Sequence, residues 1–104
     1  MTDRGLAVDR GVIDETVRAA VIEVPGVLRV GRGGPAWRTW FAGSPVRTRV
    51  VDGRVSVRIW LVARPGQSLP EVSSKVRSAV AASVERLLGL ELESVTVVVD
   101  GVGG

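Results

Sequence analysis

The sequence predicts an α+β fold: a small single-layer mixed β-sheet with two helices packed on one face, in the order α-β-β-β-α-β. Apolar residues recur at helical spacing over residues 12–24 and again over residues 69–88. Between these segments, Asp52-Gly53 joins two runs that alternate apolar and polar residues, a pattern typical of a β-hairpin. A valine-rich run over residues 95–99 provides the last strand.

Composition limits the chain to one small domain and to few kinds of chemistry. We expect the 104-residue chain to fold over residues 9–102, with residues 1–8 and 103–104 as short flexible termini. It contains no cysteine and no histidine, so it lacks thiolate chemistry and the usual general base and metal ligand. We therefore expect no enzymatic activity, no cofactor and no metal.

The N-terminal half is expected to begin with a helix and continue into a strand and a loop. Asp9 is a plausible N-cap of the helix over residues 12–24, and Pro25-Gly26 ends it. A strand over residues 27–32 should follow, with Leu28 and Val30 directed inward. Residues 31–45 are expected to form an ordered loop, a broad turn or a flexible flap. Its glycine-rich start, residues 31–34, indicates a turn rather than a phosphate-binding nest.

The hairpin over residues 46–63 is the most informative segment, because its two-residue turn fixes the pairing of the strands. Val51 pairs with Arg54, which sets Thr48 opposite Val57 and places valine, isoleucine and leucine side chains on one face. The same register places Arg47 across from Arg58, an unfavourable pair of like charges unless an anionic group lies over it. We call the other side of this hairpin the arginine face. It carries Arg47, Arg49, Arg54, Arg58 and Trp60.

The second helix has clear start and stop signals. Ser68 and Glu71 form a predicted capping box, with Pro70 in the first turn. Gly89 ends the helix, and Leu90 is placed to fold back on its last turn. The helix connects the third strand to the last one, around residues 95–99. The side chains expected to face inward are Val72, Val76, Ala79, Val80, Ser83 and Leu87.

With these residues placed, the chain resembles the bacterial alkaline shock proteins, also called general stress or envelope stress response proteins. The resemblance is carried by several segments: the apolar, alanine-rich helix that ends in Gly26-Val27, the Asp52-Gly53 hairpin, the entry to the second helix at residues 66–69 and Val72, the Leu88-Gly89-Leu90 segment, and the closing run from Val95 to Val102. The similarity extends over about residues 9–102. Residues 31–45 and Arg64-Pro65 depart from the family pattern.

The resemblance implies a non-enzymatic cytoplasmic protein linked to the cell envelope. Members of the family are thought to lie near the membrane through a membrane-anchored partner and to self-associate. The family has no catalytic motif to carry over. No segment of this chain approaches the roughly 20 apolar residues that span a bilayer, so we expect a cytoplasmic protein, peripheral at the inner face of the membrane.

Two groups of residues are candidates for partner binding. The arginine face could bind phosphate, acidic lipid headgroups or an acidic protein, or it could be the solvated back of the sheet. It could also meet Glu91 and Glu93 of a second copy. The other group is aromatic, and it contacts a partner protein, inserts at the membrane interface or folds back to cover the core. It consists of Trp37, Trp40 and Phe41.

The sequence therefore predicts an envelope stress scaffold that works by protein–protein contact and self-association. The alternative is a small nucleic-acid-binding module that uses the arginine face. The two differ in salt dependence, because phosphate binding weakens steeply with salt and packing through tryptophan does not.

Overall fold

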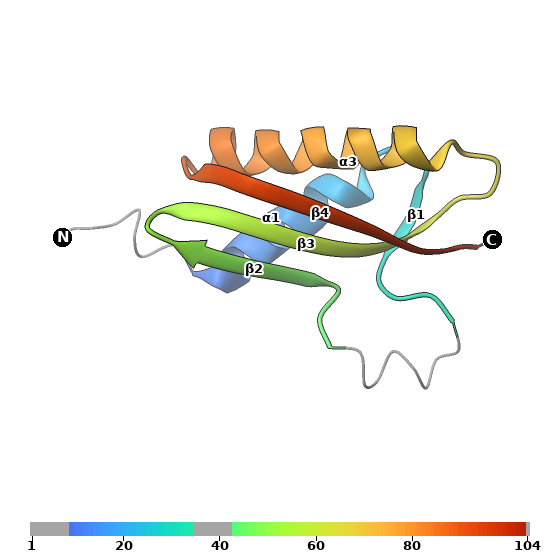
Figure 1. Ribbon diagram of the computed structural model, residues 1–104, viewed down its shortest axis with the longest axis horizontal. Coiled ribbons are helices and arrows are strands. Elements are labelled where there is room, and N and C mark those ends of the chain that lie inside the picture. The colour runs from blue at the N-terminus through green and yellow to red at the C-terminus, as the bar shows by residue number, and fades with distance from the viewer. Residues whose placement is uncertain (1–8, 35–42, 104) are drawn as a thin grey trace.

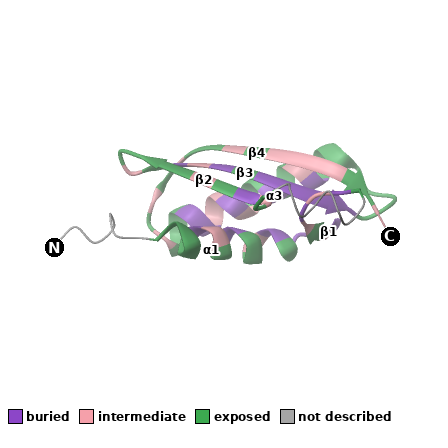
Figure 2. Cartoon of the chain, turned by 90° about the horizontal axis from the view of Figure 1, so that it is seen from below, coloured by how far each residue is buried: buried purple, intermediate pink, exposed green. Residues whose placement is uncertain are grey.

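The computed structural model describes residues 9–34 and 43–103, and it confirms the predicted α+β architecture. Two helical segments cover one face of a four-stranded sheet, and the other face is left without a helix (Figures 1 and 2). In chain order the elements are α1 (Arg10–Ile22), β1 (Val27–Val30), β2 (Val46–Val51), β3 (Arg54–Ala63), α3 (Leu69–Ala82), the π-helical turn η2 (Ser83–Leu87) and β4 (Glu91–Val102).

The sheet is organised around β3, which pairs with all three other strands. Strand β2 pairs antiparallel with its first part and β1 with its end, so these two strands share one edge of β3. Strand β4 runs parallel to β3 along the other edge. Helix α3 and the turn η2 connect β3 to β4, as the sequence predicted, and the structure shows that these two strands are parallel.

The hairpin has the predicted register at every position. Asp52 and Gly53 both have positive φ, at 52° and 77°, as a turn of this kind requires. Thr48 lies opposite Val57 and Arg47 opposite Arg58. Because side chains alternate along a strand, this register places the apolar residues on the side of the sheet that the helices cover and the arginines on the opposite side.

Helix α1 begins and ends two residues before the predicted range, and β1 ends at Val30 instead of residue 32. The Asp9 side chain accepts a hydrogen bond from the Gly11 amide, which confirms Asp9 as the N-cap. In β1 a bulge between Val27 and Arg29 changes the direction of the intervening side chain. Val27 and Val30 pack into the core, whereas Leu28, expected to face inward, lies outside it.

The second helix departs from the prediction at both ends. Ser68 is the N-cap residue, but its side chain makes no capping hydrogen bond. At the other end, the helix widens into the π-helical turn η2, which changes the directions in which the side chains of this turn point around the helix axis. Val84 is therefore fully buried, and Leu87, expected to be buried, is 74% exposed. Gly89 and Leu90 behave as predicted, with Leu90 donating its amide to the Val84 carbonyl.

The core lies between the sheet and the helices, and it consists almost entirely of branched aliphatic side chains. Alternate residues of β3 supply its floor, from Val55 to Ala63. Each helix contributes residues spaced four apart, which lie on one side of an amphipathic helix. They are Ile13, Val17 and Val21 from α1 and Val72, Val76 and Val80 from α3.

Candidate anion-binding groove on the arginine face

The arginine face is built from rows of residues that cross three strands. One row runs from Arg49 on β2 through Ser56 on β3 to Ser94 on β4. The next row continues from Arg47 through Arg58 to Thr96. Since directly paired residues point to the same side of a sheet, each row places guanidinium groups beside a hydroxyl.

A shallow groove of about 270 Å³ runs over these two rows. Its lining contains three arginines and several hydroxyl groups and no carboxylate. Guanidinium groups are donors only, and hydroxyls can turn to donate, so the groove offers many hydrogen-bond donors to an oxyanion. We call it the arginine groove. Its lining residues are Arg47, Thr48, Arg49, Ser56, Val57, Arg58, Ser94 and Thr96.

Arg54 lies on the same face but has its charge balanced within the chain. Its side chain is 3.8 Å from Glu91 and 3.9 Å from Glu93, both at the start of β4. The sequence left open that these carboxylates meet the arginine face of a second copy, whereas the structure places them beside Arg54 of their own chain. Glu91 and Glu93 therefore make this end of the arginine face acidic.

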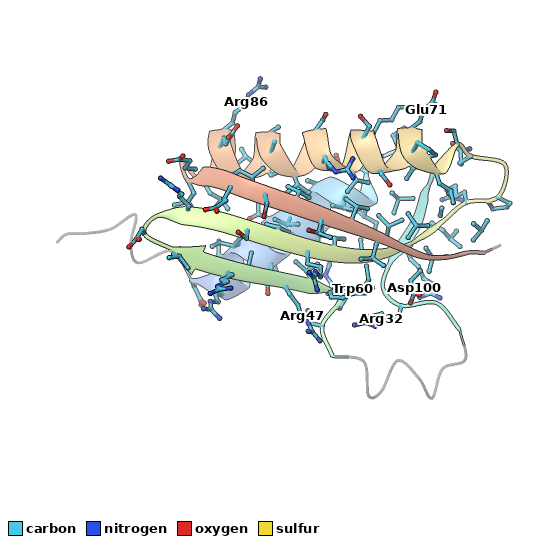
Figure 3. The ribbon with its side chains drawn as sticks, in the orientation of Figure 1. Arg32, Arg47, Trp60, Glu71, Arg86 and Asp100 are labelled. Carbon is cyan, nitrogen blue, oxygen red and sulfur yellow. The ribbon has the colours of Figure 1, made fainter. Side chains whose placement is uncertain are left out.

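Trp60 organises the opposite end, where it is only 9% exposed. The guanidinium carbons of Arg32, Arg47 and Arg58 lie 4.1, 5.2 and 5.9 Å from its ring centroid, within cation–π range. Figure 3 shows Arg32, Arg47 and Trp60 gathered where the chain leaves β1. The electron-rich ring thus offsets part of the repulsion between Arg47 and Arg58, and it holds two of the groove's three arginines in place.

The segment after β1 is fastened across this end of the face. The Gly33 amide donates to Asp100 Oδ2 of β4 at 2.9 Å, and Gly33 is buried there. A Cβ at Gly33 would lie 1.9 Å from the Asp100 carbonyl oxygen, so only glycine fits. The glycine-rich residues 31–34, predicted as a turn, therefore connect the end of β1 to the end of β4 through this hydrogen bond. They also place the Arg32 side chain over the Trp60 ring.

The structure places the partner-binding residues predicted from the sequence in different positions. Arg47, Arg49 and Arg58 come together in the arginine groove, Arg54 is paired at its border, and Trp60 lies beneath the arginines. Trp37, Trp40 and Phe41 lie outside the described residues.

The contributions of Arg32, Ser94 and Thr96 were not predicted from the sequence. The two hydroxyl residues alternate with the valines of β4, which is the available signal, but their place beside the arginines depends on the parallel register with β3.

Comparison with known families identifies the chain. Residues 2–103 match the model of the alkaline shock protein 23 family, described as having a cell envelope-related function. The chain belongs to this family. The match confirms the resemblance carried by the helix, hairpin and closing strand. No curated protein matches the sequence.

Solved structures of a domain from another protein have the same fold. Three forms of a domain named MamM CTD, including one described as a copper form, superpose with TM-scores of 0.65 at 19% identity. These matches cover 88–89% of this chain and 94–99% of that domain. At this identity the likeness concerns the fold alone. Within residues 9–34 and 43–103, no helix is long and apolar enough to cross a bilayer.

Proposed function

We propose that this family member is a non-enzymatic scaffold of the cell envelope stress response, and that its arginine groove binds an acidic segment of a membrane-anchored protein. The observation that carries the proposal is the lining of the groove, with three arginines and hydroxyls and no carboxylate. Arginine suits bidentate contacts with carboxylates. In this role the protein is cytoplasmic and peripheral at the inner face of the membrane, and it also self-associates.

The borders of the groove favour an acidic protein segment over nucleic acid. Glu91 and Glu93 lie at one end and Asp100 at the other, so a long polyphosphate chain would meet carboxylates once it extended past the groove. Single-stranded nucleic acid is usually held by bases stacked on exposed aromatic rings. Trp60, the aromatic residue of the described face, lies beneath arginines instead.

Arg49 is the best residue with which to test the groove, because it lines the groove but does not stack on Trp60. We expect Arg49→Glu to weaken binding of a fluorescent oligoglutamate peptide by roughly tenfold or more, as measured by anisotropy. Arg77→Glu is the matched control. It makes the same change of charge at an exposed position on α3, outside the groove, and should bind as the wild type does.

The same assay separates the other readings of the face. A single-stranded oligonucleotide of equal length, and vesicles that contain acidic lipid, are tested beside the peptide at low and high salt. Tighter binding of the oligonucleotide, lost steeply with salt and on Arg49→Glu, would identify the groove as a phosphate-binding surface and overturn the proposal. Equal peptide binding by wild type and Arg49→Glu would also overturn it.

A further inference from the structure

The outer side of α3 carries a set of side chains that is complementary to itself. Glu71 and Arg86, at opposite ends of this helical segment, both project from the side of it that lies away from β4, past that edge of the sheet (Figure 3). Residues 71, 75, 78 and 82 recur at helical spacing between them and share one side of the helix. At the middle of this side the residues are small, with Ser78 exposed and Ala82 half-buried.

The π-helical turn is what brings Arg86 into line with Glu71. In an uninterrupted α-helix the step of fifteen positions from Glu71 to Arg86 would carry Arg86 about 60° past the direction of Glu71. The wider turn over Ser83–Leu87 advances less per residue and removes most of that difference. The opposite charges therefore stand on the same side of the helix.

These two charges are too far apart to pair within one chain. Fifteen residues of helix separate them by ~22 Å, and neither forms an ion pair with another residue of the described part of the chain. An antiparallel second copy of the same helix, centred between Ser78 and Ala79, places Glu71 opposite Arg86 twice. Lys75 then faces Ala82 of the other copy, so no like charges are opposed.

We propose that two copies of this chain associate through the outer sides of their α3 helices, packed antiparallel about a two-fold axis. The small residues at the centre allow the helices to approach closely, and the pairs at the two ends fix the direction and register. This interface rests on the self-association in the proposed function, and it uses a surface that does not include the arginine groove.

Charge reversal gives a direct test, because the interface is isologous. We expect Glu71→Arg and Arg86→Glu each to weaken self-association at least tenfold, since each turns two attractions into two repulsions. The doubly reversed variant, E71R with R86E, should associate as the wild type does. An equimolar mixture of the two single variants should form heterodimers, because one then carries two arginines and the other two glutamates.

Sedimentation velocity over a concentration series measures these species, and Arg77→Glu again serves as the control. Arg77 is exposed on α3 but lies about 100° around the helix from Ser78. A wild type that stays monomeric, single variants that associate as well as the control, or single variants that do not pair when mixed would each overturn the interface. Peptide binding to the groove is measured on the same variants, so failure of the interface and failure of the groove are distinguished.

Discussion

At the scale of single residues, the arginine face shows how one aromatic ring can organise several like charges. Arg47 and Arg58 are paired directly across two strands, which is unfavourable in isolation. The Trp60 ring lies near both guanidinium groups and also takes a third from Arg32. The arginine stems cover the ring in return, so the side chains that form the groove also complete the packing of this end of the sheet.

Gly33 gives a sharp prediction at the same scale. Gly33→Ala should lower the free energy of unfolding by about 2–4 kcal/mol, because its Cβ would overlap the Asp100 carbonyl and force the β1–β4 tie apart. Urea unfolding monitored by tryptophan fluorescence measures the loss. Gly11→Ala is the control, since there a Cβ lies 3.7 Å from the Asp9 carboxylate in a helix, and stability should rise by up to about 1 kcal/mol. Similar behaviour of the two variants would contradict the prediction.

At the scale of elements, the hairpin was predictable to the residue and the end of the second helix was not. A two-residue turn and a period of two leave one register for β2 and β3, so the sequence alone determines which residues form the arginine face. The turn η2 depends instead on how Val84 and Leu90 pack against the core, which local sequence does not reveal. For the same reason, Ser94 and Thr96 could not be assigned to the groove, because a parallel register is set by the length and packing of the intervening helix.

The phase shift at η2 leads to a second prediction about stability. Val84→Ala should destabilise the fold by about 2 kcal/mol, because it removes fully buried methyl groups and leaves a cavity. Leu87→Ala should change stability by less than about 0.5 kcal/mol, because that side chain is mostly exposed. The midpoints of urea unfolding compare the two variants. A larger loss for Leu87→Ala would mean that the helix continues without the π-helical turn.

At the scale of the whole molecule, the position of α3 determines where two arginine grooves would lie in the proposed dimer. The outer side of α3 points past the β4 edge of the sheet (Figures 1 and 3), so two helices that meet there lie side by side in the plane of Figure 1. The two-fold axis of such an antiparallel pair is perpendicular to that plane, and it leaves the uncovered faces of the two sheets pointing the same way. The dimer would therefore present both grooves to one surface.

This arrangement predicts bivalent binding. A peptide with two acidic segments, joined by a flexible linker long enough to span both grooves, should bind the wild type about 10²-fold more tightly than a single segment does. Glu71→Arg should lose that gain and keep the affinity for one segment. Isothermal titration calorimetry with the two peptides measures both quantities. A full gain in the Glu71→Arg variant would show that the grooves are not joined through α3.

The central place of β3 also matters while the chain is being synthesised. Strands β1 and β2 occupy one edge of β3 as soon as the hairpin has closed, whereas the other edge waits for β4, the last strand to leave the ribosome. Until then a nascent chain carries an open, apolar strand edge of the kind that recruits foreign strands. We therefore expect the nascent chain to be most exposed to aggregation between translation of Ala63 and docking of Glu91–Val102.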